Sequence, residues 1–255
     1  MLRKLGDFSM TKKETRTLIL FGVSIIFVNL VLRLLLKPLP EEIAFLIKTL
    51  GLGCGYYFLV HKRLGLKIKS TKKISWSETL SVCWFLLLAD FFYVSAVALG
   101  ISKAPHMIGT ALVIALGAGF FEEYFFRGLF LKLAFQDGIR SSKQVLGVVL
   151  LSALSFGLAH LVNLTHQPLN ATLFQVYYAT AIGIFFAAIY LRTGSLWWTI
   201  ILHFLIDFAS VLISQSTQAA PATSIWNFIF WLPLIALGLF LIRPKKLKAI
   251  RYLND

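Results

Sequence analysis

Long apolar stretches separated by short polar or basic segments dominate the sequence. A bilayer hydrocarbon core about 30 Å thick is crossed by about 20 residues of α-helix, at about 1.5 Å per residue. We expect transmembrane helices at eight stretches: 17–36, 43–60, 80–99, 107–135, 144–164, 172–191, 196–214 and 225–242. The pattern predicts an all-α, polytopic membrane helix bundle in which residues 17–242 form one transmembrane domain.

Composition agrees with the bilayer as the solvent of this chain. Of 255 residues, 58% are hydrophobic and 15% aromatic, and the mean hydropathy is +0.79, which excludes an ordinary soluble domain. The net charge of +14 does not indicate a nucleic-acid partner, because the basic residues lie in short segments between the apolar stretches. Cys54 and Cys83 fall inside predicted helices, so we expect small buried side chains rather than a disulfide or metal pair.

The basic residues also predict an orientation. Lys and Arg are concentrated before the first predicted helix and after the second, fourth, sixth and eighth, whereas the alternate connections hold only Lys37 and Lys103. Cytoplasmic connections carry this excess. We therefore expect residues 1–16 and 243–255 to be basic cytoplasmic segments. The compact chain with its short polar N-terminus is typical of a bacterial plasma-membrane protein.

Three charged residues, Glu122, Glu123 and Arg127, lie near the middle of the apolar stretch 107–135, which also holds Lys132 near its end. Each charge near the bilayer centre costs about 2.5–3.5 kcal/mol on insertion scales, so it requires a partner or a function. Residues four apart share a helix face, so Arg127 can neutralise Glu123. Glu122 points in another direction and has no such partner on its own helix.

Two further stretches carry ionisable side chains among apolar neighbours. Phe156 and His160 are four apart in the stretch 144–164, and His203 and Asp207 are four apart in the stretch 196–214. Polar sites on three helices of one bundle favour a shared polar centre over separate helix–helix hydrogen bonds. His160 lies about five residues, roughly 8 Å, outward of its helix centre, so helix tilt must bring it to the common depth.

Other polar residues receive structural interpretations. Arg33 and Lys48 are expected to reach a nearby interface. Asp90 either pairs with a basic residue or faces a wet cavity, and it has no assigned role. Three histidines lie in connections and are expected to be solvated: His61, His106 and His166. Five glycines are expected to allow close helix packing: Gly51, Gly53, Gly55, Gly117 and Gly119.

A carboxylate and two imidazoles in an apolar cavity suit amide hydrolysis. Glu122 can take a proton from water as a general base, and a neighbouring imidazole can share that work. A second imidazole can donate a hydrogen bond to the carbonyl oxygen that becomes negative during attack. The residues therefore predict a hydrolytic centre within the membrane.

The motifs Glu122-Glu123-x-x-x-Arg127, Phe156-x-x-x-His160 and His203-x-x-x-Asp207, in this order on separate helices, resemble those of the CPBP intramembrane proteases. That family includes type II CAAX prenyl endopeptidases and bacteriocin self-immunity proteins. The resemblance covers a motif core at 107–214, and the first three helices match only in character. It implies an endopeptidase whose partners are membrane lipid and a membrane-associated or lipidated peptide substrate.

The resemblance also implies catalytic roles. Glu122 and His160 would activate water, and His203 with Asp207 would stabilise the oxyanion. An ionised Asp207 cannot donate a hydrogen bond, so it would rather accept one from His203, fixing the tautomer of that ring and favouring its charged form. No cofactor is required on this interpretation, and the alternative is a zinc ion on Glu122, His160 and His203. Three residues would support the site: Glu123, Arg127 and Phe156.

Two other functions stay open at this point. A non-catalytic immunity or scaffold protein could bind a peptide in the same cavity, and a transporter could use buried Glu and His as a proton relay. Paired, interrupted helices that would indicate inverted transporter repeats are not evident. The sequence leaves the substrate, its prenylation and the oligomeric state open.

Overall fold

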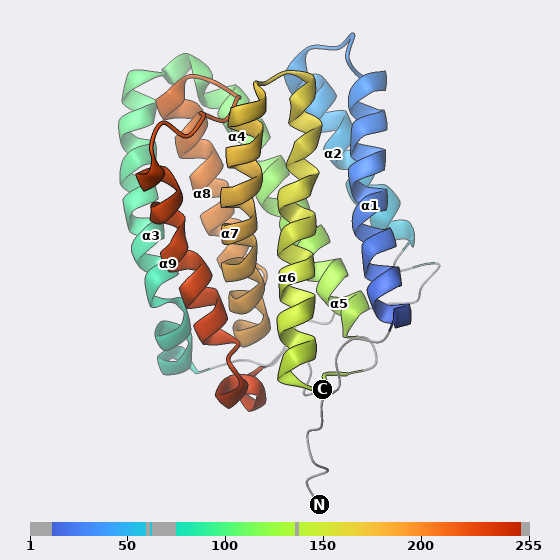
Figure 1. Cartoon of the computed structure of the whole chain (residues 1–255). Helices are drawn as coiled ribbons and strands as arrows, with labels where there is room; N and C mark the ends of the chain where they lie inside the picture. The colour runs from blue at the N-terminus through green and yellow to red at the C-terminus, as the bar shows by residue number, and fades with distance from the viewer. Residues whose placement is uncertain (1–11, 60–61, 63–74, 136–137, 251–255) are drawn as a thin grey trace, which may run out of the picture.

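A computed structural model describes residues 12–59, 62, 75–135 and 138–250, and Figure 1 shows them as a bundle of helices that run mostly along one direction. The α-helices are Lys12–Leu35 (α1), Glu41–Phe58 (α2), Trp76–Lys103 (α3), Ile108–Gly117 (α4), Phe130–Ala134 (α5), Ser142–Ala159 (α6), Leu169–Thr193 (α7), Trp197–Ser214 (α8) and Ile225–Leu241 (α9). The described residues contain no strand, which confirms the all-α prediction.

Six helical segments in the described part of the chain are long and apolar enough to cross a membrane. They are Thr15–Leu35, Trp76–Lys103, Pro105–Ala134, Ser142–Thr165, Leu169–Thr193 and Trp197–Ser214. Two further predicted spans, Ile43–Phe58 and Ile225–Leu241, are helical and apolar but shorter. The chain is therefore an integral membrane helix bundle, and the count of eight spans stays a prediction.

The stretch 107–135 differs from the single regular helix that we expected. It begins as a 3₁₀ turn, Pro105–Met107 (η2), continues as α4 and α5, and has two π-helical segments between them, Ala118–Glu122 (η3) and Tyr124–Leu129 (η4). The π-helix is rare and occurs mainly as single turns inside α-helices, often at functional sites. Here the two segments contain Glu122 and Arg127, and Glu123 lies between them.

The helix α7 lies at the centre of the bundle and contacts α3, α6, α8 and α9. Its side chains from Ile184 to Leu191 are buried. The approach of α6 depends on two glycines: a Cβ at Gly183 would lie 2.9 Å from the Ala153 Cα atom, and one at Gly157 would overlap the Thr180 hydroxyl. Small residues allow such close helix packing, which supplies much of the stability of membrane bundles.

The helix α2 is packed on only part of its surface. A Cβ at Gly53 would overlap the Phe121 ring, as expected for a packing glycine, but Gly51 and Gly55 have nothing within 4 Å. Cys54 is exposed, whereas Cys83 on α3 is buried. The expectation of close packing is therefore wrong for Gly51 and Gly55, and the expectation of burial is wrong for Cys54, because an apolar sequence does not distinguish packed from lipid-facing positions.

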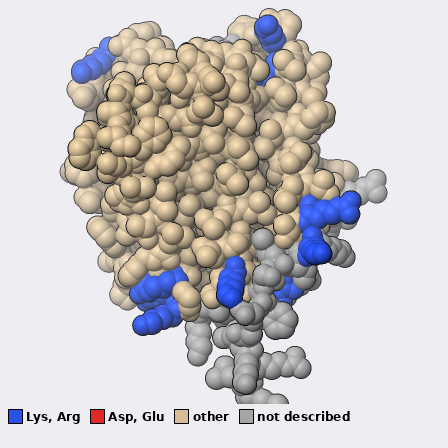
Figure 2. Space-filling view, viewed as in Figure 1, with Lys and Arg blue, Asp and Glu red and all other residues tan. Residues whose placement is uncertain are grey.

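The start of α1 and the end of α9 lie at the same end of the bundle (Figure 1). In Figure 2, most of the visible Lys and Arg side chains gather toward that end, and a broad surface without charged side chains separates them from the other end. Residues 1–11, 60–61, 63–74 and 251–255 lie outside the described residues, and with them parts of the predicted terminal segments, His61 and the end of the second predicted helix. The cytoplasmic placement of both termini stays a prediction.

Candidate active site

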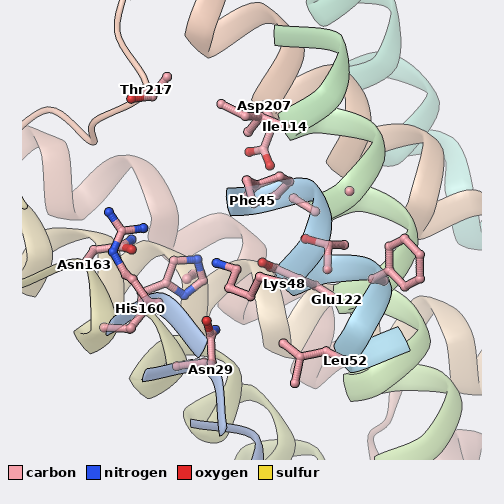
Figure 3. Close-up of a pocket in the computed structure, with 18 of the residues that line it drawn as sticks. Asn29, Phe45, Lys48, Leu52, Ile114, Glu122, His160, Asn163, Asp207 and Thr217 are labelled. Carbon is pink, nitrogen blue, oxygen red and sulfur yellow. The ribbon is translucent and has the colours of Figure 1, made fainter. Parts of the chain in front are cut away.

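A cavity of about 500 Å³ is lined by residues of α1, α2, α4, α6, α7 and α8. All four predicted catalytic side chains, Glu122, His160, His203 and Asp207, belong to its wall. Figure 3 shows Glu122, His160 and Asp207 directed into the same space. The volume lies in the range of cavities that hold small ligands in proteins. Side chains from three separate parts of the chain thus meet, as the sequence predicts.

The π-helical segment reaches this cavity because Gly119 has no side chain. A Cβ at Gly119 would lie 3.0 Å from the Phe204 nitrogen and 3.1 Å from the Ile200 carbonyl oxygen, both backbone atoms of α8. Contacts this short would force one of the two backbones to move. The glycine therefore sets the distance between the glutamate pair and His203.

Glu123 is the buried anchor of the site. Its Oε1 atom accepts hydrogen bonds from Arg127 Nη1 at 2.8 Å and from His203 Nδ1 at 3.0 Å. Glu123 and Arg127 are both 0% exposed. A buried ion pair needs such additional contacts to offset the loss of hydration. The predicted pairing of Glu123 with Arg127 is present in the structure, and its second contact, to His203, is new.

His203 lies among three carboxylates. Its Nδ1 atom is 3.0 Å from Glu123, and its Nε2 atom is 3.6 Å from Asp207 Oδ2 and 4.0 Å from Glu122 Oε2. Because an ionised carboxylate only accepts hydrogen bonds, Nδ1 carries a proton and donates it to Glu123. The expectation that Asp207 fixes the tautomer is wrong in this geometry, since Glu123 does so and Asp207 lies beside the opposite nitrogen.

His160 lies where α6 ends and a 3₁₀ segment, His160–Thr165 (η5), begins. The His160 backbone N–H donates to the Gly157 carbonyl, and the Phe156 carbonyl is 3.0 Å from the His160 Nδ1 atom. A carbonyl only accepts, so Nδ1 carries the proton in this contact and Nε2 keeps its lone pair when the ring is neutral. The change of helix type holds His160 in the cavity wall despite its outward position on the helix.

Phe156 joins the two imidazoles. Its ring centroid is 5.2 Å from that of His160 and 5.9 Å from that of His203, with the planes nearly perpendicular in both pairs. The Arg127 guanidinium carbon lies 4.4 Å from the centroid of the same ring, a favourable cation–π distance. The predicted supporting residue thus contacts the ion pair as well as both rings.

Glu122 differs from its neighbour in being accessible from the cavity. Its side chain is 33% exposed, and its Oε2 atom has no hydrogen-bond partner among the described residues. The Oε2 atom itself is buried, so the exposed part of the carboxylate is the part that can accept a hydrogen bond from a water molecule in the cavity. The sequence predicts this difference between the two glutamates from the position of Arg127.

Two cavity residues are missed by the sequence analysis. Lys48 does not simply extend toward an interface: it belongs to the cavity wall, and Figure 3 shows its side chain reaching the space between His160 and Glu122. Asn29 also lines the cavity, and its Oδ1 atom is buried without a hydrogen-bond partner. The depth of Lys48 within its helix was an available signal, whereas an Asn in an apolar helix was not. Asp90 lies off the cavity wall and keeps no assigned role.

The zinc alternative requires Glu122, His160 and His203 to converge on one ion. In the described residues, no three His, Cys, Asp or Glu side chains are arranged to hold a metal ion. The Nδ1 atoms of both histidines are engaged, one with Glu123 and one with the Phe156 carbonyl. Histidines that bind a metal through Nε2 often have such Nδ1 contacts, so these contacts do not decide metal dependence.

A comparison with protein families supports the assignment from the motifs. A family model described as type II CAAX prenyl endopeptidase Rce1-like matches residues 104–209. Over these residues the chain is similar to the Rce1-like endopeptidases. The Rce1-like region runs from the end of α3 into α8 and contains all three motifs, whereas α1 and α2 lie outside it. This similarity favours peptidase activity for the matched region. Neither a curated protein nor a solved structure matches the chain.

Proposed function

We propose that the protein is an intramembrane endopeptidase in which Glu122 activates water for the hydrolysis of a peptide bond. The observation that carries this proposal is the single cavity that joins Glu122, His160, His203 and Asp207 within the Rce1-like region. A carboxylate with an available oxygen, a ring nitrogen with a lone pair and a second ring that can donate are the groups that amide hydrolysis requires.

The first step is the attack of water. The carboxylate of Glu122, whose side chain is partly exposed, accepts a proton from a water molecule as the water oxygen bonds to the carbonyl carbon. The Nε2 atom of neutral His160 accepts the second hydrogen bond of that water and orients it. Correctly placed general bases of this kind contribute about 10²- to 10⁴-fold to the rate.

The second step is the stabilisation of the oxyanion and the departure of the amine. His203 donates from Nε2 to the oxyanion when it is doubly protonated, while Glu123 holds its Nδ1 atom. Asp207, 3.6 Å from the same Nε2 atom, favours this protonated ring. The protonated Glu122 then returns its proton to the leaving nitrogen, which breaks the peptide bond and restores the carboxylate.

The mouth of the cavity indicates the side from which the substrate enters. The exposed wall residues Lys37 and Gln218 lie in the connections after α1 and α8, and the exposed wall residue Thr165 is the last residue of η5. These connections belong to the end of the bundle away from the start of α1 and the end of α9. With both termini cytoplasmic, as the basic segments predict, a peptide enters from the outer half of a bacterial plasma membrane.

The test is cleavage by purified protein in lipid vesicles. A randomised, internally quenched peptide pool is incubated with the wild type and with Glu122→Ala, His160→Ala and His203→Ala, and the products are read by mass spectrometry. Each variant should lose cleavage while still inserting into the membrane. Asp90→Asn, a polar substitution away from the cavity, is the matched control and should keep it. Cleavage by all three alanine variants would contradict the proposal.

Metal dependence is tested on the same preparation. Because the described donors do not form a metal site, we expect the cleavage rate to be unchanged after chelation with EDTA. Loss of activity that zinc restores would replace this proposal with a metal-dependent one. No observation favours the non-catalytic immunity or transport alternatives over hydrolysis.

A further inference from the structure

The cavity wall includes a phenol that the steps proposed above do not use. Tyr178, on α7, lines the same cavity as Glu122, His203 and Asp207. It lies within the residues that the family model matches, but outside the three motifs. A phenol keeps its proton at neutral pH and can donate a hydrogen bond, which an ionised carboxylate cannot do. The cavity therefore has a neutral donor in the same wall as the reacting groups.

The ring of Tyr178 is held by aromatic neighbours. It stacks on the Trp231 ring of α9, with the centroids 5.3 Å apart and the planes at 24°, and it meets the Phe174 ring edge-on at 5.4 Å. Aromatic pairs of this kind contribute about 0.5–1.5 kcal/mol beyond the burial of their area. Because these contacts fix the ring, the position of its hydroxyl is set before a substrate binds, as the electrostatic stabilisation of a transition state requires.

A network of amide side chains sets the direction of the Tyr178 hydrogen. The Oε1 atom of Gln175 accepts hydrogen bonds from Asn163 Nδ2 at 2.9 Å and from Gln167 Nε2 at 2.8 Å. The Gln175 side chain also forms a hydrogen bond with the Tyr178 hydroxyl. Because the oxygen of this amide already has two donors, its NH₂ group is the end that donates to the phenol oxygen. The phenol hydrogen is therefore left for a different acceptor.

The surroundings of the phenol indicate which acceptor this is. The charges of Asp207 and Glu122 both act on Tyr178, and that of Asp207 acts more strongly. The Asp207 Oδ2 atom is also 3.6 Å from His203 Nε2, the atom that donates to the oxyanion in the second proposed step. The phenol, Asp207 and this ring nitrogen therefore border one part of the cavity. An oxyanion formed there is repelled by ionised Asp207, and a second neutral donor would offset that repulsion.

We propose that Tyr178 is a further catalytic residue, whose O–H donates a second hydrogen bond, beside that of His203 Nε2, to the oxyanion of the peptide bond under attack. This inference rests on the proposed function. The hydrogen bond strengthens as the carbonyl oxygen becomes negative, and the phenol keeps its proton throughout. Tyr178 thus lowers the barrier to the attack of water without changing the products.

Kinetics of Tyr178→Phe in lipid vesicles test this role. Loss of one oxyanion donor lowers kcat by about 10²- to 10³-fold in other hydrolases, so we expect kcat to fall on the order of 100-fold with KM within about threefold. The matched control is Tyr177→Phe, one residue earlier on α7. Its hydroxyl donates to the Phe228 carbonyl at 2.8 Å, and it does not line the cavity, so kcat should be retained. Equal kcat values for the two variants would overturn the proposal.

A pH profile separates donation from packing. A fluorinated tyrosine has nearly the shape of tyrosine but loses its proton at lower pH, and a phenol donates only while it is protonated. With 3,5-difluorotyrosine at position 178, the alkaline loss of kcat should move to lower pH, whereas the same replacement at position 177 should leave the profile unchanged. The titratable groups that act on this phenol, Asp207 on α8, Tyr93 on α3 and Glu122 on η3, are the same in both proteins. An unshifted profile at position 178 would overturn the proposal.

Binding of a transition-state analogue tests the same contact without turnover. Two fluorescent pools of randomised peptides are compared on Glu122→Gln protein, one with a phosphinate in place of the central peptide bond and one with the ordinary bond. The protein should bind the phosphinate pool more tightly, and adding Tyr178→Phe should reduce that ratio about tenfold, a difference of about 1.4 kcal/mol. Adding Tyr177→Phe should leave the ratio unchanged. A ratio that does not depend on Tyr178, or equal affinity of the Glu122→Gln protein for both pools, would overturn the proposal.

Cleavage by the wild type separates this inference from the proposed function. Cleavage together with a phosphinate ratio that is independent of Tyr178 would leave hydrolysis intact and reject the second donor. A ratio that depends on Tyr178 without any cleavage would contradict hydrolysis and leave Tyr178 as a donor to an anionic oxygen in the cavity.

Discussion

Two sides of the cavity differ in how their side chains are held. The reactive side, formed by Glu122, His160, His203 and Asp207, is supported by buried groups that bond one another. The cationic side, formed by Arg33, Lys37 and Lys48, consists of long side chains from α1, the connection after it and α2. On the reactive side, Glu123 is 0% exposed and bonds both Arg127 and His203. On the cationic side, Lys37 is exposed and Arg33 is held by a single hydroxyl. The difference indicates that the reactive side is held rigidly by internal contacts, whereas the side chains of the cationic side are more exposed.

The largest expected effect is on stability, and it comes from removing the cation of the buried Glu123–Arg127 ion pair. Arg127→Met leaves Glu123 as a buried carboxylate without its cation, which should lower the free energy of unfolding by about 3–5 kcal/mol. The measurement is thermal unfolding in detergent. The double variant Glu123→Gln with Arg127→Met removes both charges and should recover part of the loss. A single variant as stable as the wild type would show that the pair does not hold the site.

Glu123→Gln tests positioning without removing the side chain. The amide keeps the shape, but it no longer obliges His203 Nδ1 to donate, so the ring loses its fixed tautomer. We expect kcat to fall on the order of 100-fold with a much smaller change in KM, as for other residues that orient a catalytic histidine. If kcat falls only as far as the fraction of folded protein falls, Glu123 has a purely structural role.

Gly119→Ala should move the π-helical segment η3 and the helix α8 apart by a small distance. The new methyl group would press on the backbone of α8 beside His203, which should cost about 1–3 kcal/mol of stability and lower the cleavage rate. Gly55→Ala is the matched control, because nothing lies within 4 Å of that position. It should be neutral or stabilise by up to about 1 kcal/mol.

The smallest effect belongs to the cationic side. Thr165→Val removes the acceptor that holds Arg33 Nε while keeping the side-chain volume. We expect the loss of this one hydrogen bond to lower the free energy of unfolding by about 0.5–1.5 kcal/mol, measured by thermal unfolding in detergent, with no change in the cleavage rate. A large drop in the cleavage rate would show that Thr165 supports the reactive side instead.

The sequence predicts the residues of the reactive side well, because they occur in pairs that are close together in the sequence. A spacing of four places Arg127 on the face of Glu123 and Asp207 on the face of His203, and the high cost of buried charge predicts that these groups converge. The contact between Glu123 and His203 is not predictable in this way. It joins residues 80 positions apart and depends on how closely Gly119 allows two helices to approach.

The sequence pattern does not predict the π-helical turns, nor does it predict the direction of the Lys48 side chain. The reasons differ. A run of apolar residues around Glu122 satisfies an α-helix and a π-helix equally, so periodicity cannot distinguish them. For Lys48, a flexible side chain can reach either an interface or a cavity, and the choice depends on the space that α1 and α7 leave open. The faces of α2 are equally ambiguous, because packed and lipid-facing residues are both apolar.

The central claim is that Glu122 activates the attacking water while other groups hold the peptide. Its most direct test measures peptide affinity and single-turnover cleavage together for the wild type and Glu122→Gln in the same vesicles. The account predicts a rate at least about 100-fold lower with affinity within about threefold of the wild type. A Glu122→Gln protein that binds the peptide equally well and cleaves it at the wild-type rate would contradict it.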